Sequence, residues 1–579
     1  MSKKLLLVLL AISLLLVGCN AYEFYPDYQE TQNIDEFFEQ YRIKVLQMDP
    51  EMATYMGEFE GHEASRNDDE LTDRSHEFAE HKMEFYKESL KILKSFDDAS
   101  LSHQQRLNRD VLAWHLNLEI EGESFMLHEY QFYYPFSSAQ YHQIHSVEDA
   151  ENYICRIEAV PLQLEQLSGR IGKQVEQGII PPAITFLTYL RQFAESIRIE
   201  PGEDSLFTTF VTSLEGSEIP DDVKTQLEDK ALIAIGSHVL PAYKEFHESL
   251  LSLKDEVVAA SAALGVWDLP QGDEYYAHAI RMQTTTDLTP QEIHDLGLQE
   301  VERIQDEIRE RLIDLGFEDP DPIQTLVDLG EQDLVRDKDE ILAECRRVVE
   351  ETYELLPDLF NTLPRAEVIV EPGSLDSYQR PSRDGQRPGV FYVTADRPHA
   401  KKDIEHLVFH ETIPGHHLQL ALQMESDLPI FREFTENAAY KEGWALYAER
   451  LMYENGLYSD VWSELGYLQS ELFRAARLVI DTGIHYKQWD RQYATDQLYE
   501  LCGVYSESEI ARYAEWWPGQ ALAYKIGELK MLELREMAME QLGNDFDLKE
   551  FHDVVLSMGS VPLEILEQEV LRYIEEKQN

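Results

Sequence analysis

Apolar residues recur at helical spacing along the first half of the chain. Between about residues 35 and 251 they return every three or four positions, and acidic residues fill the places between them. This spacing predicts amphipathic helices that bury one face and leave the other in water. One stretch that shows both faces contains Phe78, Glu80, Glu84, Phe85, Tyr86, Glu88, Leu90 and Leu93.

The sequence near residue 290 predicts the N-terminus of a helix. Thr289 can cap its first turn, Pro290 suits the first helical position, and Glu292 completes a capping box. The apolar positions that follow form one stripe, which we expect to belong to the core. They are Ile293, Leu296, Val301, Ile304, Ile308 and Leu312.

The pattern changes near Ala366. Two runs of β-branched and aromatic residues, at 368–370 and 390–394, are separated by a stretch rich in proline and glycine. Such runs predict two short strands joined by a loop. From Lys402 to the C-terminus the helical spacing returns. The expected fold is therefore mainly α, a largely helical protein with one small β-sheet beside the residues considered below.

The N-terminus has the order of an export signal. Lys3 and Lys4 precede an apolar run that ends in Leu16-Val17-Gly18-Cys19, and this run is too short for a good transmembrane helix. The ending resembles a bacterial lipobox, in which the cysteine is lipidated; an ordinary signal peptide is the alternative. We expect a signal peptide at residues 1–18, a lipidated Cys19 with a tether to residue 34, and one domain at 35–579.

Composition narrows the classes of function. The chain has 579 residues, of which 43% are hydrophobic, so its bulk is globular. Its 110 acidic and 50 basic residues give a net charge of −60. That sign argues against a nucleic-acid partner and against a basic patch for anionic lipid. Cys155, Cys345 and Cys502 are odd in number and far apart, which argues against a disulfide framework.

The segment His410-Glu411-Thr412-Ile413-Pro414-Gly415-His416-His417 carries the candidate chemistry. Neutral imidazoles bind zinc, and a carboxylate beside them can take a proton from an activated water. The usual motif is H-E-x-x-H on one helix, with the two histidines four residues apart. Here the second histidine comes two residues late, after a Pro-Gly pair.

In an unbroken helix, His410 and His416 would lie about 9 Å apart along the axis. Zinc bonds of about 2.0–2.1 Å cannot span that distance. Pro414 interrupts helical hydrogen bonding and Gly415 tolerates unusual dihedral angles. We therefore expect these two residues to loop out as a bulge, so that His416 returns to the place of an i+4 histidine.

Two other histidines are alternative ligands. His417 would bind if the bulge takes up three residues, and His406 lies one helical turn before His410. A catalytic zinc site also needs a third protein ligand and leaves one position for water. Glu442 is the candidate, because it lies in an apolar and aromatic segment; a solvated surface glutamate is the alternative reading of this residue. Gly443 beside it would permit two helices to approach closely.

Glu411 has a different expected role from the ligands. It is adjacent to one of them and is not itself bound to the metal, so it is placed to act as the general base. The developing oxyanion would need a donor besides the metal.

The motifs resemble the bacterial family catalogued as domain of unknown function 885. The resemblance rests on the histidine motif and on the segment from Glu442 to Glu449, with further matches near residues 49–54, 384–389, 477–485 and 518–524. That family is similar to the helical zinc peptidases typified by thimet oligopeptidase, angiotensin-converting enzyme and thermostable carboxypeptidases. The resemblance implies a helical shell split by a deep cleft, with zinc on its floor.

The resemblance also suggests residues around the metal. Tyr524 follows Pro518-Gly519-Gln520, where the related peptidases keep a catalytic tyrosine, although core packing is the alternative. Gln520 is expected to face the substrate. The strand at residues 390–394 could bind an extended peptide by edge pairing.

One helical face carries further candidates for substrate binding. Arg477, Asp481 and His485 are spaced to lie on one helical face. Arg477 could clamp a substrate carboxylate and His485 could donate a hydrogen bond to substrate; an internal salt-bridge stack is the alternative. His417, if it is not a ligand, is also expected to contact the substrate.

These expectations combine into one function. The chain is expected to be a zinc-dependent hydrolase that cleaves amide bonds of short peptides at the bacterial cell envelope. A lipid anchor would hold it to a membrane, either facing the periplasm or at the outer membrane. The alternatives are a non-catalytic peptide-binding lipoprotein and a zinc hydrolase of some non-peptide amide. The intact His410, Glu411, His416 and Glu442 argue against the non-catalytic alternative.

Overall fold

A computed structural model describes the folded part of the chain. It covers residues 28, 31–56, 68–130, 134–260, 264–332, 334–383, 385, 387–435 and 437–579. The predicted signal peptide, Cys19 and most of the tether lie outside these residues. Within the described ranges, none of the helices combines the length and the apolar character that a membrane crossing requires.

Helices make up most of the described chain, which confirms the mainly α prediction. Those before the sheets are α2 (Ile34–Met48), α3 (Pro50–Met56), α4 (His76–Leu93), α5 (His103–Glu121), α6 (Val147–Glu176), α7 (Ala183–Ser196), α8 (Ser205–Glu215), α9 (Asp221–Ala234), α10 (Leu240–Ala260), α11 (Gly272–Thr284), α12 (Pro290–Asp314), α13 (Pro322–Gln332) and α14 (Lys338–Leu359). Those after them are α15 (Ile404–Glu411), α16 (His416–Glu425), α17 (Ala438–Glu454), α18 (Val461–His485), α19 (Arg491–Cys502), α20 (Glu507–Ala511), α21 (Gln520–Leu542), α22 (Leu548–Ser557) and α23 (Leu563–Gln578).

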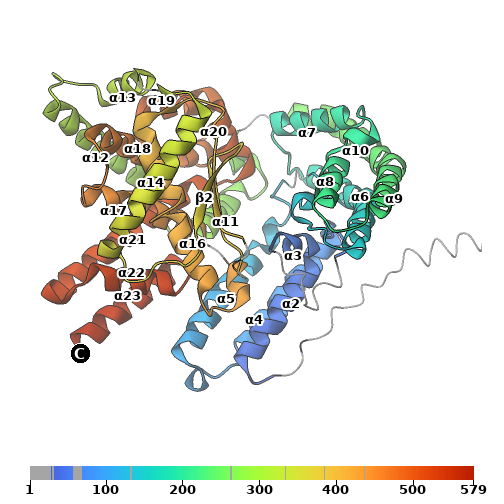
Figure 1. The fold of residues 1–579 in the computed structure, drawn as a ribbon, viewed down its shortest axis with the longest axis horizontal. Coiled ribbons are helices and arrows are strands. Elements are labelled where there is room, and N and C mark those ends of the chain that lie inside the picture. Colours follow the sequence, from blue (N-terminus) through green and yellow to red (C-terminus); the bar gives the residue numbers. More distant parts are fainter. Residues whose placement is uncertain are drawn as a thin grey trace, which may run out of the picture.

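The helices gather in three groups. Figure 1 shows α6 to α10 in a lobe at the right and α12 to α23 in a larger body at the left, with α2, α4 and α5 near the lower edge between them. Each group has its own buried apolar cluster. The cluster of the larger body is the most extensive, and it contains the helices of the histidine motif.

Local signals in the sequence account for the start of α12. The Thr289 side chain accepts a hydrogen bond from the amide of Glu292, and the Glu292 carboxylate accepts one from the amide of Thr289. This is the predicted capping box, and it satisfies amide groups that the helix leaves unpaired. The predicted stripe along α12 is buried except for Leu296, which is half-buried.

The sheet beside the histidine motif has three strands. β2 (Val368–Pro372) and β4 (Gly389–Val393) are the two predicted strands, and they pair in parallel. β3 (Ser377–Gln379) pairs antiparallel with β4 on its other side, which gives the order β2-β4-β3. The prediction that β4 binds a peptide along its edge is therefore wrong, because both of its edges are already paired.

The sequence did not predict three short strands, β1 (Leu334–Val335), β3 and β5 (His399–Ala400). β3 has only three residues within the loop-rich stretch. A second sheet pairs β1 with β5, and each of these strands has two residues. Strands of this length carry no alternation that a sequence pattern could reveal.

A glycine contact brings α17 against α21. A Cβ atom on Gly443 would come within 2.5 Å of the Gly527 backbone, and one on Gly527 within 1.8 Å of the Ala439 carbonyl oxygen. These separations leave no space for a side chain, so the predicted close approach at Gly443 is confirmed. The contact fixes the distance between the helix that carries Glu442 and the helix that carries Tyr524.

Candidate metal centre

The histidine motif spans a break between two helices. α15 ends at Glu411 and α16 begins at His416, with Thr412 and Gly415 both outside helical dihedral angles. The predicted bulge within one helix is therefore wrong in form: Pro414 ends the first helix and a second one starts.

Gly415 has the unusual dihedral angles that were expected of it, with a φ of −78° and a ψ of −127°. A side chain would also not fit here, because a Cβ atom would meet the His410 carbonyl oxygen at 2.0 Å. The connection is held from the other side by Trp444 of α17, whose indole N–H donates to the Pro414 carbonyl at 2.9 Å. The chain can therefore turn back tightly enough to bring His416 beside His410.

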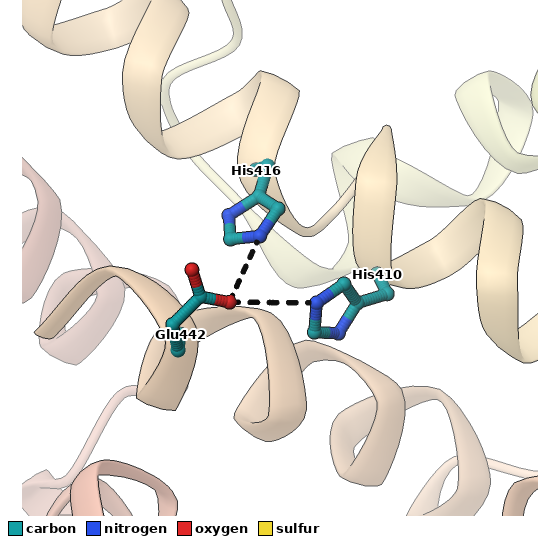
Figure 2. Close-up of side chains that lie close together, drawn as sticks. All are labelled: His410, His416 and Glu442. Carbon is teal, nitrogen blue, oxygen red and sulfur yellow. Dashed lines mark ion pairs between the residues drawn. The ribbon is translucent and has the colours of Figure 1, made fainter. Parts of the chain in front are cut away.

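His410, His416 and Glu442 point toward one another. The Glu442 Oε2 atom lies 3.3 Å from His416 Nε2 and 3.7 Å from His410 Nε2. Figure 2 shows the three side chains converging from α15, α16 and α17. All three are buried, and they form the one group of candidate ligands found among the described residues. The structure thus brings together the predicted set, with His416 rather than His417 or His406.

The trio formed by His410, His416 and Glu442 has the dimensions of a zinc site. Ligand atoms about 2.0–2.1 Å from a tetrahedral zinc lie roughly 3.3–3.4 Å from one another. The two separations from Glu442 are close to this value, and the three donor atoms all lie within 4.8 Å of one another. Two imidazoles and a carboxylate are also a donor set that zinc accepts. The residues present therefore fit the metal.

The electrostatics of the trio favour a positive charge. Burial alone would lower the pKa of His410, but the nearby carboxylates of Glu442 and Glu449 raise it to about 9. Burial alone would raise the pKa of Glu442, but His416 and His410 hold it well below its usual range. Both shifts show that the surrounding carboxylates stabilise a cation at this position.

A second carboxylate supports the trio from behind, and the sequence analysis missed its role. Glu449 is fully buried and its Oε1 atom lies 2.8 Å from His410 Nδ1. Its other oxygen accepts a hydrogen bond from Ser470 and lies 3.5 Å from His406 Nδ1. His406 thus contacts the supporting carboxylate and is not one of the three converging residues. A carboxylate on the far nitrogen fixes the tautomer and orientation of a ligating histidine.

We predict that Glu449→Gln weakens metal binding about 10–100-fold without emptying the site at high metal concentration. A glutamine can still contact His410 but cannot hold a proton on Nδ1 as firmly as a carboxylate. Competition with a chromophoric chelator measures the affinity. Glu454→Gln is the matched control, since Glu454 lies on the same helix and pairs with Arg450 at 3.0 Å. Equal affinities for the two variants would contradict the supporting role.

The two predicted catalytic side chains both lie at the trio. Glu411 is only 9% exposed, and burial raises the pKa of its carboxyl although His410 and His416 act against this. The ring of Tyr524 lies 6.4 Å from the ring of His410 and nearly parallel to it. The amide group of Gln520 is 3.5 Å from the Tyr524 hydroxyl, one helical turn away. Their catalytic roles stay predictions.

Arg477 lies against Tyr524. Its guanidinium stacks on the Tyr524 ring at 4.8 Å and on the Phe473 ring at 4.3 Å, and Nε donates to the Tyr513 hydroxyl at 3.1 Å. These contacts hold the tyrosine ring in place. Asp481 accepts hydrogen bonds from the Tyr276 hydroxyl and the Gly519 amide, so the alternative salt-bridge stack is not formed.

His417 and His485 have both ring nitrogens engaged by protein groups. His417 contacts the Tyr378 hydroxyl at 2.7 Å and the Ala366 carbonyl at 3.0 Å. His485 Nδ1 accepts from the Val266 amide and its Nε2 faces the Tyr513 carbonyl, each at 3.1 Å. Neither ring has a nitrogen left for substrate. The prediction that they contact substrate has no support in these contacts, which join distant segments instead.

The contacts of His485 predict a dependence of stability on pH. Burial lowers the pKa of His485 to about 4, and its Nδ1 faces an amide donor, so the native ring is neutral. The unfolded chain has an ordinary pKa near 6.5. The stability from the neutral ring is therefore complete above about pH 6.5 and falls away as pH drops toward 4. The loss amounts to about 3 kcal/mol.

We expect His485→Gln to be less stable than the wild type near pH 7.5 but to lose less stability on acidification. Urea unfolding of metal-free protein at about pH 7.5 and 4.5 measures both differences. His238→Gln is the control, because His238 is exposed on the surface of the lobe. An unchanged slope of stability with pH in His485→Gln would refute the assignment.

The sequence and the fold identify a protein family. Residues 50–570 match the family described as "Bacterial protein of unknown function (DUF885)". The chain belongs to this family. The match includes every residue of the candidate metal centre, and no curated protein matches the chain. The resemblance drawn from the motifs is thereby confirmed at the level of the DUF885 family.

Two solved structures are similar to this DUF885 protein. A candidate lipoprotein from Colwellia psychrerythraea shares 28% sequence identity, with a TM-score of 0.85 over 94% of this chain and 99% of that one. A candidate lipoprotein of unknown function from Shewanella oneidensis shares 20% identity, with a TM-score of 0.74 over 93% of this chain and all of that one. The second likeness shows a shared fold alone.

Proposed function

We propose that this protein is a zinc-dependent hydrolase that cleaves amide bonds of short peptides. The observation that carries the proposal is the convergence of His410, His416 and Glu442 with Glu411 beside them. A group of two imidazoles and one carboxylate has a cost in a buried site unless a cation is bound. Hydrolysis needs an acidic residue that does not bind the metal in addition to the metal ligands, and Glu411 is such a residue.

His410, His416 and Glu442 would hold the metal, and zinc would supply a Lewis acid that polarises the scissile carbonyl and acidifies a water. Glu411 would take the proton from that water and pass it to the leaving amine. The Tyr524 hydroxyl would donate a hydrogen bond to the oxyanion. Arg477 would keep the Tyr524 ring in position through their stacking contact.

Burial of the site supports short peptides as the substrate class. His410, His416, Glu442 and Glu411 are each at most 9% exposed. A folded protein cannot place a peptide bond at a site so recessed, whereas a short extended chain can. The expected deep cleft agrees with this reading and stays a prediction.

The export segment and the structural relatives support an envelope location. We infer that Cys19 carries lipid, on the lipobox-like ending and on the description of the similar Colwellia psychrerythraea structure as a candidate lipoprotein. Cys19→Ser is expected to lose the lipid and to leave the membrane fraction without detergent. Mature mass and partition unchanged by the substitution would contradict the inference.

A combined experiment tests the proposed activity. Purified protein is analysed for metal, incubated with a library of short peptides, and the products are identified by mass spectrometry. We expect one zinc per chain and cleavage that stops with chelator and returns with zinc. Zinc binding without cleavage of any peptide would favour a non-peptide amide substrate or a binding function. Absence of zinc binding would refute the proposal as a whole.

A further inference from the structure

A cavity of about 310 Å³ lies apart from the trio, where α2, α4, α5, α6 and α11 meet. Its volume is that of a site for a small molecule. Its wall on α11 consists of Tyr275, His278 and Met282. The neighbouring Ala279 on the same helix approaches Gly519, at the start of α21. None of His410, Glu411, His416, Glu442 and Tyr524 is among the residues that line the cavity.

The wall of the cavity is rich in methionine and aromatic side chains. Five of the 13 methionines of the chain line it, which concentrates this residue type at one place. Methionine side chains are flexible and polarisable, so they adapt to apolar groups of varied shape. The five are Met48, Met52, Met83, Met126 and Met282, and the aromatic residues beside them include Tyr41, Phe78, Tyr86, Phe125 and Tyr275.

Four acidic residues line the cavity, and two of them, Asp49 and Asp73, accept hydrogen bonds from nearby backbone amides. The other two are Glu119 and Glu129. Glu129 is exposed as a whole residue, but the chain packed around its carboxyl and the charge of Glu119 raise the pKa of that group, whereas Arg170 and Lys82 lower it. Among the described residues Glu129 has no ion pair within 4 Å and no side-chain hydrogen bond. Glu119 lies 3.9 Å from the His115 ring, and burial lowers the pKa of that imidazole, so it does not neutralise the carboxylate.

The cations that line the cavity have other contacts. Lys82 lies over the Tyr86 ring at 5.5 Å, and no ion pair within 4 Å joins it to Glu119 or Glu129. Arg170 donates to the Met126 carbonyl, and Arg74 pairs with Glu51 at 3.2 Å. Lys82 and Arg170 lower the pKa of the Glu129 carboxyl from a longer range. Among the described residues, no lysine or arginine pairs directly with Glu119 or Glu129 within 4 Å.

Two kinds of ligand would suit these carboxylates, a metal ion and an organic cation. Within the described ranges, His410, His416 and Glu442 are the one group with donor atoms close enough to hold a metal. The carboxylates and imidazoles of the cavity are therefore too far apart to do so. Aromatic faces beside carboxylates recognise ammonium groups, and the methionine wall suits an attached apolar group. We propose that this cavity binds an organic ammonium ion that carries an apolar substituent.

Isothermal titration with phenethylammonium tests the site. The full mature chain is used after removal of metal, so that the amine cannot coordinate at the trio and the result does not depend on hydrolytic activity. 2-Phenylethanol, which has the same shape without the charge, is the matched probe. We expect saturable binding of the ammonium and at least about tenfold weaker binding of the alcohol.

Two variants locate the binding in the cavity. Glu129→Gln is expected to weaken phenethylammonium binding at least about tenfold. Ala79→Leu places a larger side chain in the cavity wall and is expected to weaken both probes. Glu123→Gln is the control, because Glu123 lies in the neighbouring turn η3 (Gly122–Phe125) but pairs with Lys87 at 2.7 Å outside the cavity.

The results that overturn the proposal are distinct. Failure of phenethylammonium to bind would do so, as would equal affinities for the amine and the alcohol. Unchanged binding in folded Glu129→Gln would also refute it. If Glu129→Gln does not fold, Ala79→Leu decides instead, and unchanged affinity in that variant places the binding elsewhere. None of these outcomes bears on metal binding or peptide cleavage, so the two proposals fail separately.

Discussion

Glu442→Gln is expected to abolish stoichiometric zinc binding. The substitution replaces a charged ligand with a neutral amide. His410 and His416 are then the only two good donors left in the site. Removal of a supporting partner alone costs about 10–100-fold in metal affinity, so loss of a ligand should exceed 100-fold. The buried Glu442 carboxylate is also what holds a positive charge here, because it lies 3.3 Å and 3.7 Å from the two ring nitrogens. Metal analysis after dialysis against a weak chelator measures the loss.

A pair of adjacent substitutions tests the register of the same site. His416→Gln should empty the site as Glu442→Gln does. His417→Gln should keep the metal, because His417 contacts Tyr378 and Ala366 instead. Its expected cost is in stability, since both of its ring nitrogens are buried with protein partners. Zinc retained in His416→Gln, or lost in folded His417→Gln, would show that the histidine motif binds in another register.

Much of the fold follows from local patterns that act within one helix. The stripe on α12 and its Thr289 cap depend on residues a few positions apart, so the sequence shows them directly. The order of the sheet does not have this property. Whether β4 is an edge or a centre depends on the three-residue strand β3, which has no pattern of its own. The prediction of edge pairing was wrong for this reason.

The trio was predictable because the chemistry restricts the ligands and geometry restricts their spacing. The break between α15 and α16 was expected only in part: the sequence predicted that Pro414 and Gly415 interrupt helical structure, but not that the His410 carbonyl leaves no room for a side chain at Gly415. Glu449 had a signal that was not used. It lies seven residues after Glu442, hence on the same face of α17 and in an apolar run. The sequence could not show that His485 contacts Val266 and Tyr513, because these partners belong to distant segments of the chain.

Glu411→Gln is expected to keep zinc and fold but to lose nearly all hydrolysis. Glutamine has nearly the same shape as glutamate, so the packing at the end of α15 should be unchanged. It cannot accept a proton from water or return one to the leaving amine. Proton transfer by a positioned side chain is typically worth about 10²–10⁴-fold in rate. We therefore expect a fall in kcat of that size, with little change in zinc content.

Variants of two neighbouring residues separate metal binding from proton transfer. His410 and Glu411 are adjacent in the chain, and it is the His410 ring whose Nε2 atom lies 3.7 Å from Glu442 Oε2. His410→Gln should lose metal and activity together, whereas Glu411→Gln should lose activity alone and still bind peptide. Zinc content, peptide affinity and rate are compared for both variants and the wild type. A near-normal rate in Glu411→Gln would remove the general base from the mechanism. The trio would still bind metal in that case, and another residue would have to act as the base.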